Sequence, residues 1–211
     1  MRRNSLEIRP LAGAIGAEIA GVDLARELDG DTVAAIRQAW LDRLVVFFRG
    51  QHLPPAQLLA VARRFGEPIE YPFVNGLVDF PEITPVVKLE HERVNFGGLW
   101  HSDTAYLETP PMGTMLIARE VPPYGGDTLF ANMYLAYETL SPGMRRLLDG
   151  LVAVNSSAKA DVTKTREDRM RDAARADARK EYEALRSCAP IPRPAGRRST
   201  SMAATPCASA T

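Results

Sequence analysis

A continuous apolar run at residues 44–48 is the sequence feature that most constrains the fold. Its β-branched and aromatic residues favour a strand, and its lack of polar residues is typical of a strand buried on both faces. Before the run, Val33, Ile36 and Trp40 recur at helical spacing after a capping signal at Asp29. After the run, a pair of prolines is suited to the first turn of a second helix. A buried strand between two helices predicts a fold that mixes α and β structure.

The rest of the chain reads mainly as short strands separated by proline- and glycine-rich turns. One more helix is expected at residues 141–151, because Ser141 and Pro142 combine an N-cap with a proline at the first helical position. Strands are expected at residues 6–8, 17–22, 83–89, 114–117, 128–131 and 152–154. The pattern therefore predicts a mainly β fold with a few flanking helices.

The composition is that of an ordinary globular protein. The 211 residues are 45% hydrophobic, and 26 basic residues balance 26 acidic ones, so one domain can bury a core and no basic excess indicates nucleic-acid binding. No apolar stretch approaches the roughly 18 residues of a membrane span. Two cysteines, Cys188 and Cys207, do not form a disulfide framework. We expect a cytoplasmic protein without membrane contact.

The segment Trp100-His101-Ser102-Asp103 carries the candidate chemistry. Its aromatic and β-branched neighbours predict a strand, in which His101 and Asp103 would share one face because side chains alternate. An imidazole beside a carboxylate is two thirds of the facial triad that holds non-haem Fe(II). A structural or solvated His-Asp pair is the competing interpretation, and the segment alone does not exclude it.

The last quarter of the chain changes character. Residues 158–186 are dense in alternating charge, which is typical of a solvated helix or loop and compatible with a lid over a site. Residues 187–211 show no helix or strand pattern, and their composition predicts an irregular, disordered tail. A frameshift is the alternative, because freely chosen codons let a neighbouring frame read a turn (PETG) followed by a β-type run (ALYV).

Several segments together resemble the taurine/2,4-D dioxygenase family (TauD/TfdA-like). They run in order through residues 5–157 and include Gly16-Ala17-Glu18, Val46-Phe47-Phe48-Arg49-Gly50, Trp100-His101-Ser102-Asp103, Gly125-Gly126-Asp127-Thr128-Leu129 and Tyr137-Glu138-Thr139-Leu140-Ser141. The resemblance implies a double-stranded β-helix, a jelly-roll-like core with flanking helices, incomplete at its C-terminal end. It assigns residues 1–186 to the dioxygenase domain.

The resemblance also implies the chemistry. His101 and Asp103 match two iron ligands and are the expected catalytic residues, and Thr128 matches a residue that hydrogen-bonds 2-oxoglutarate. The implied reaction uses Fe(II), 2-oxoglutarate and oxygen to hydroxylate a small sulfonate, sulfate ester or carboxylate, with release of succinate and CO2. Tyr71 falls near a substrate-contacting tyrosine of the taurine enzyme. The taurine enzyme also uses a histidine in the region that matches residues 68–76, and this region has no histidine here, so taurine itself is disfavoured as the substrate.

The sequence departs from the family at two positions. The third iron ligand, a histidine, and an arginine that pairs with 2-oxoglutarate have no counterpart, and the histidines are His52, His91 and His101. Two alternatives to an active dioxygenase therefore stay open: an inactive truncated fragment and a non-oxidative jelly-roll metal-binding protein. A third possibility is that a neighbouring subunit donates the missing histidine and so completes the site. The oligomeric state, a homo-oligomer included, is open at this point.

Overall fold

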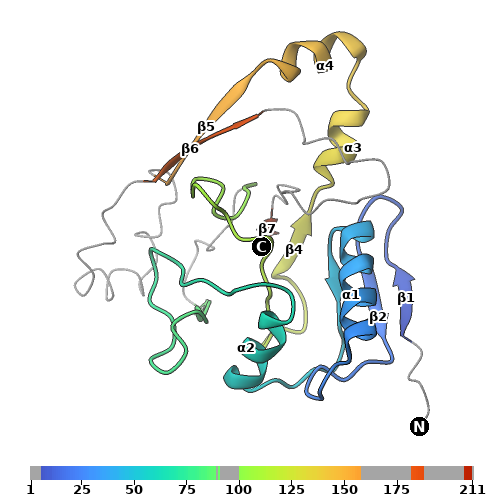
Figure 1. The fold of residues 1–211 in the computed structure, drawn as a ribbon, viewed down its shortest axis with the longest axis vertical. Helices are drawn as coiled ribbons and strands as arrows, with labels where there is room; N and C mark the ends of the chain where they lie inside the picture. Colours follow the sequence, from blue (N-terminus) through green and yellow to red (C-terminus); the bar gives the residue numbers. More distant parts are fainter. Residues whose placement is uncertain (1–5, 89, 91–99, 158–181, 188–206, 211) are drawn as a thin grey trace.

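A computed structural model describes residues 6–88, 90, 100–157, 182–187 and 207–210 (Figure 1). In this part of the chain, short strands and helices are connected by long loops. The elements are β1 (Glu7–Pro10), β2 (Ala17–Ala20), α1 (Gly30–Arg43), β3 (Val46–Phe47), α2 (Pro55–Arg63), β4 (Asp127–Phe130), α3 (Met133–Glu138), α4 (Pro142–Asp149), β5 (Val152–Ser156), β6 (Glu183–Ser187) and β7 (Cys207–Ala210). The predicted mixture of sheets and helices is confirmed.

The N-terminal third forms a small sheet covered by helix α1, as Figure 1 shows at the right of the molecule. Its strand order is β1-β2-β3, with β1 and β2 antiparallel and β2 and β3 parallel. Ile8 lies opposite Ile19 in the β1–β2 register. Ala17 and Ile19 of β2 are buried and alternate with half-buried residues, because every second side chain of a strand points to the covered face.

Helix α1 begins and ends where its sequence signals predict. Asp29 is the N-cap, and its carboxylate accepts a hydrogen bond of 2.7 Å from the backbone N–H of Thr32. Leu44 ends the helix with a positive φ of 66°, and the indole of Trp40 donates a 3.1 Å bond to the Leu44 carbonyl. The helix therefore ends shortly before β3, and the hydrogen bond holds the Trp40 indole at this end of the helix.

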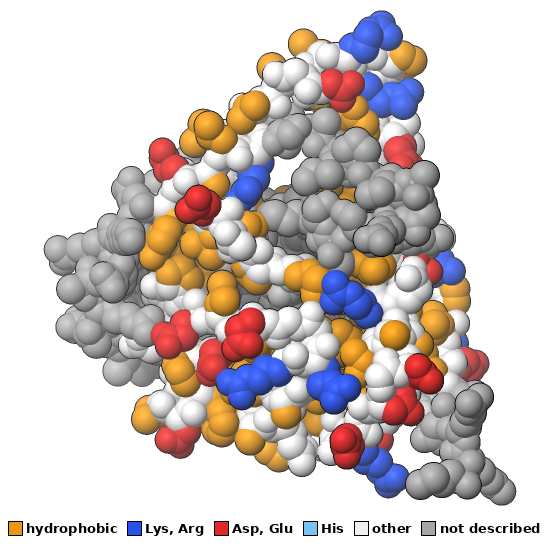
Figure 2. Space-filling model, viewed as in Figure 1, with side chains coloured by type: hydrophobic (Ala, Val, Ile, Leu, Met, Phe, Trp, Pro, Cys, Tyr) orange, Lys and Arg blue, Asp and Glu red, His pale blue; other side chains and the backbone are white. Residues whose placement is uncertain are grey.

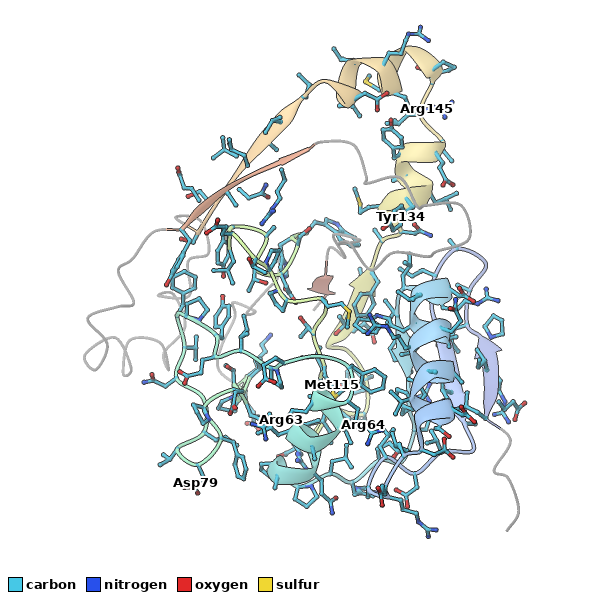
Figure 3. All side chains as sticks on the ribbon, in the orientation of Figure 1. Arg63, Arg64, Asp79, Met115, Tyr134 and Arg145 are labelled. Atoms are coloured by element: carbon cyan, nitrogen blue, oxygen red, sulfur yellow. The ribbon has the colours of Figure 1, made fainter. Side chains whose placement is uncertain are left out.

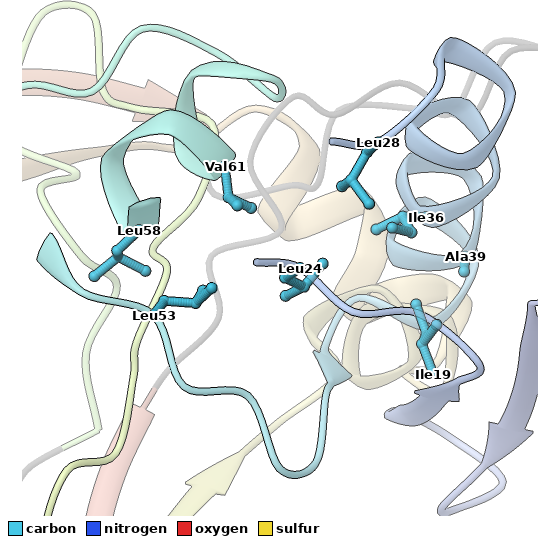
Figure 4. Packing of buried hydrophobic residues seen from close by; sticks show 8 residues of the cluster. All are labelled: Ile19, Leu24, Leu28, Ile36, Ala39, Leu53, Leu58 and Val61. Carbon is cyan, nitrogen blue, oxygen red and sulfur yellow. The ribbon is translucent and has the colours of Figure 1, made fainter. Parts of the chain in front are cut away.

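The main hydrophobic core lies between α1, α2 and the loops that join them to the sheet (Figure 4). Its buried members are Ile19, Leu24, Leu28, Ile36, Ala39, Leu53, Leu58 and Val61. Burial of one such leucine or isoleucine side chain contributes about 1.5–3 kcal/mol. Ile117, which lies beyond the His-x-Asp segment, packs against the same cluster. The core therefore anchors the chain on which the candidate site is built.

The structure differs from the predicted strands in several places. The apolar run at 44–48 forms only the two-residue strand β3, because Leu44 is used as the cap of α1 and is not extended. Phe47 is exposed, so the strand is not buried on both faces. Residues 114–117 form a loop that pairs with no strand of the described chain, and the described part of 83–89 is likewise a loop. The predicted strands near residues 7, 18, 128 and 153 are confirmed, and helix α3 was not predicted.

The C-terminal part also departs from the expected irregular segments. Ser187 belongs to β6, which pairs antiparallel with β5, and residues 207–210 form β7, which pairs with β4. The remainder of the predicted lid and tail, residues 158–181 and 188–206, lies outside the described residues. Figure 1 shows β5 and β6 as an arm at the upper left, and Figure 2 shows hydrophobic side chains along it. Among the described residues, no helix is long and apolar enough to cross a membrane.

Candidate metal centre

Residues 100–102 form a loop and residues 103–106 form a turn, so the predicted strand at residues 100–104 is wrong. Thr104 has a positive φ of 50°, and the N–H of Leu107 donates a 3.0 Å bond back to the Thr104 carbonyl. Residues 104–106 are buried, and their packing holds a backbone conformation that is costly for a β-branched residue. The His101 and Asp103 side chains therefore meet at a turn, and not through the alternation of side chains along a strand.

His101 and Asp103 lie in direct contact. The Nε2 atom of His101 is 3.0 Å from Oδ1 of Asp103, and both side chains are more than one third exposed, at 37% and 45%. Solvent-borne ions and small molecules can therefore reach the pair. The predicted proximity of the two side chains is confirmed, although the backbone that creates it is different.

The second oxygen of Asp103 has its own partner. The Thr114 hydroxyl donates a 2.7 Å hydrogen bond to Oδ2. The hydrogen bond from His101 lowers the pKa of the Asp103 carboxyl, burial opposes this shift, and the Thr114 bond lowers the pKa further. Asp103 is therefore held as a carboxylate, which is the form that binds a cation.

The spacing of the pair fits a metal ion. Two ligand atoms about 2.1 Å from one metal and at right angles to each other are about 3.0 Å apart. The observed distance between Nε2 and Oδ1 is 3.0 Å. The same 3.0 Å is the length of the hydrogen bond between the two groups, so an ion at this pair would replace the proton that His101 shares with Asp103. Among the described residues, no group of three or more His, Cys, Asp or Glu side chains could hold a metal.

The other predicted site residues are placed apart from this pair. Thr128 lies on β4, is exposed, and stands opposite Ser209 in the β4–β7 register. His52 is exposed in the loop before α2, and His91 lies outside the described residues. The contacts that join His101, Asp103 and Thr114 do not include Thr128. Its expected role toward 2-oxoglutarate therefore stays a prediction.

Four aromatic rings gather beside the His-Asp turn. The Phe73 ring lies 5.7 Å from Tyr71, 5.7 Å from Tyr106 and 5.9 Å from Tyr182, measured between ring centroids. Burial raises the pKa of Tyr106, and Tyr71 and the charge of Asp103 raise it further, so its hydroxyl stays protonated. Tyr106 is thus close enough to the carboxylate to be influenced by its charge, and its ring contact with Phe73 joins the turn to the aromatic cluster.

Arg186 of β6 anchors the same turn from the C-terminal side. Its guanidinium donates to the carbonyls of Ala105, at 3.3 Å, and Glu108, at 3.2 Å, and it also donates to the carbonyl of Leu107. The β5–β6 arm is thereby fastened to the residues that follow Asp103. Neither this contact nor the one from Thr114 could be found in the sequence, because each joins residues far apart in the chain by hydrogen bonds that leave no local pattern.

The family model described as "Taurine catabolism dioxygenase TauD, TfdA family" matches residues 7–203. This chain belongs to the TauD/TfdA family. An alpha-ketoglutarate-dependent sulfate ester dioxygenase of Pseudomonas putida is 38% identical over 153 residues, which are 72% of this chain and 50% of the relative. An alkylsulfatase of Acinetobacter baylyi is 37% identical over 155 residues, which are 72% of this chain and 47% of that protein.

Solved structures of the TauD/TfdA family resemble this chain as well. A taurine dioxygenase from Burkholderia xenovorans matches with a TM-score of 0.58 and 39% identity, over 71% of this chain and 54% of that structure. A second, putative taurine dioxygenase of the same organism matches with a TM-score of 0.61 and 35% identity, over 72% and 56%. The chain spans about half the length of the curated relatives it matches.

Proposed function

We propose that this TauD/TfdA chain belongs to an Fe(II)- and 2-oxoglutarate-dependent dioxygenase that hydroxylates a small anionic substrate. The observation that supports this most directly is the contact of 3.0 Å between His101 and Asp103 in a chain of this family. Oxidative chemistry needs a redox-active ion, and a neutral imidazole with a carboxylate is the donor set that suits ferrous iron.

The substrate class is inferred from the relatives. Their names include a sulfate ester dioxygenase, an alkylsulfatase and dioxygenases of phenoxypropionate and 2,4-dichlorophenoxyacetate. All of these substrates carry a sulfate or carboxylate group. We therefore propose a sulfonate, sulfate ester or carboxylate for this chain, with molecular oxygen as co-substrate and no nucleic acid or membrane as partner.

The proposed mechanism assigns tasks to the candidate site residues. His101 and Asp103 would hold the iron, and the Thr128 hydroxyl would donate to a carboxylate of 2-oxoglutarate, which is costly to bury without a donor. When bound, iron and 2-oxoglutarate would supply the oxidising chemistry that yields succinate and CO2. The ring contact between Phe73 and Tyr106 supports the turn that carries Asp103.

The complete enzyme fold is part of the same proposal. The solved relatives favour a jelly-roll, double-stranded β-helix, whereas the described residues hold three separate small sheets. We assign residues 1–186 to the dioxygenase domain. A cytoplasmic location, an irregular or frameshifted tail and a homo-oligomer stay predictions.

A non-oxidative metal-binding protein is the second candidate. It is favoured by the donor set, because the described residues contribute two ligands where a facial triad has three. An inactive fragment would have the same donor set. Both would bind a divalent ion weakly at His101 and Asp103 and would not turn over 2-oxoglutarate.

Succinate formation distinguishes these functions. The purified chain is incubated with Fe(II), 2-oxoglutarate, oxygen and one of three substrates: an alkylsulfonate, an alkyl sulfate or a phenoxyacetate. We expect substrate-dependent succinate that is lost in His101→Ala. Succinate at the level of that variant with all three substrates would contradict the dioxygenase, and metal binding without succinate would favour the second candidate.

A further inference from the structure

The two oxygens of the Asp103 carboxylate have different partners. Oδ1 faces the His101 imidazole at 3.0 Å, and Oδ2 accepts the Thr114 hydroxyl at 2.7 Å. A carboxylate on a partly exposed side chain rotates freely about its terminal bond unless one oxygen is held. The Thr114 bond removes this freedom and leaves Oδ1 on the side of the imidazole.

We propose that Thr114 is a positioning residue that orients Asp103 for metal binding. This inference rests on the proposed metal site and adds to it a residue outside the His-x-Asp segment. The hydroxyl does not touch the ion. It keeps Oδ1 beside Nε2 of His101 before the ion arrives, so that both atoms lie within reach of one ion, which lowers the entropy cost of binding.

The position of Thr114 is itself determined by helix α1. A Cβ atom at Gly113 would lie only 2.3 Å from Cζ2 of Trp40, so the indole ring packs directly on the Gly113 backbone. On the other side, Ile117 packs against the main core. Thr114 therefore lies between two anchored residues, although its segment has no strand partner among the described residues. Figure 3 labels Met115, the next residue, near the centre of the molecule.

The magnitude of the effect follows from comparable sites. Partners that orient a metal-binding side chain typically change metal affinity by about 10–100-fold when they are removed. Thr114 is exposed, and it makes a single hydrogen bond to the ligand, yet that bond is short and its acceptor is charged. We expect its loss to weaken metal binding within this range without removing the fold.

Serine and alanine at position 114 isolate the hydroxyl, because both lack the threonine methyl group. Mn(II) alone is titrated into the full-length chain and free Mn(II) is measured by electron paramagnetic resonance. We expect Thr114→Ser to bind like the wild type and Thr114→Ala to show a dissociation constant about 10–100-fold higher. Thr109→Ala, the same change at an exposed threonine, is the matched control and should not alter binding.

A second measurement covers the case in which the alanine variant is less stable. The rise in melting temperature caused by a fixed excess of Mn(II) depends on the dissociation constant and is measured within each variant. Equal Mn(II) affinity and equal shifts for the serine and alanine variants would overturn the proposal. If the wild type and His101→Ala bind Mn(II) equally, the metal site itself is wrong.

Discussion

At the scale of single residues, Thr104 combines two unfavourable features. Its φ is positive, and its hydroxyl is buried without a hydrogen-bond partner among the described residues. Such strain tends to occur where the surrounding structure imposes a geometry that function needs. Thr104 directly follows Asp103, so its unfavourable conformation and buried hydroxyl belong to the same turn that places Asp103 against His101.

Replacement of this hydroxyl should stabilise the protein. Thr104→Val keeps the β-branched shape and removes a polar group whose burial without a partner costs about 1–3 kcal/mol. We expect the free energy of unfolding in urea to rise by about 1 kcal/mol, with Mn(II) affinity unchanged. Thr109→Val is the control at an exposed site. A loss of stability in Thr104→Val would mean that the hydroxyl has a partner.

The charge of Asp103 should be essential to metal binding. Asp103→Asn retains the size of the side chain and can still accept the Thr114 hydrogen bond, but it removes the negative charge and one anionic ligand atom. We expect Mn(II) affinity to fall by more than about 100-fold, beyond the effect of an orienting partner. Isothermal titration of Mn(II) measures the change.

The control for this variant is Asp79→Asn. Asp79 is exposed and lies in a separate loop, as Figure 3 shows. The two substitutions change the net charge equally, so a general electrostatic effect would appear in both. Equal affinity of Asp103→Asn and wild type would show that the ion binds elsewhere.

At the scale of elements, the β5–β6 arm and the His-Asp turn are joined by one side chain. Arg186 is half-buried and donates to three carbonyls between two and five residues beyond Asp103. Tyr182, at the start of the arm, adds ring contacts to Phe73 and Tyr106 at 5.9 and 6.3 Å. The arm therefore supports the turn through both a charged group and an aromatic cluster.

Arg186→Ala should loosen this connection. Hydrogen bonds that involve a charged group contribute about 1.5–3 kcal/mol, and the carbonyls would lose that partner. We expect the free energy of unfolding in urea to fall by about that amount and Mn(II) affinity to weaken. Arg146→Ala, at an exposed arginine of α4, should change neither quantity. A stability equal to that of the wild type would show that the arm does not support the turn.

At the scale of the whole molecule, the β5–β6 arm exposes three large apolar side chains. Val152, Val154 and Leu185 are 60%, 62% and 68% exposed, and Val154 lies opposite Leu185 in the β5–β6 register. A two-stranded ribbon is marginally stable alone, and exposed apolar strands favour association. Self-association of the purified chain is therefore expected.

A charged pair across the ribbon should reduce this association. Val154→Lys combined with Leu185→Glu replaces two exposed apolar side chains by opposite charges at facing positions, which adds a favourable cross-strand pair. We expect less light scattering at the same protein concentration and an unchanged melting temperature. Equal scattering of variant and wild type would indicate that another surface associates.

The sequence by itself determined helices α1, α2 and α4, several strands and the choice of the two proposed ligands. Asp29 caps α1 and Ser141 caps α4 as their positions predict, because these bonds join residues three apart in the chain. The His-x-Asp segment also predicted that His101 and Asp103 meet, since an imidazole and a carboxylate separated by one residue can meet in a strand or in a turn.

Only the tertiary structure decided how that chemistry is held. The turn at Thr104, the Thr114 hydrogen bond to Asp103 and the Arg186 contacts with residues 105–108 depend on segments that are brought together by packing on α1 and the arm. Local propensity reflects interactions within a few residues, so it favoured a strand at 100–104. The hydrogen bonds from Thr114 to Asp103 and from Arg186 to Ala105 join residues that are 11 and 81 positions apart in the chain. These contacts outweighed the local preference, because the packing of distant segments fixes them and no local pattern encodes them.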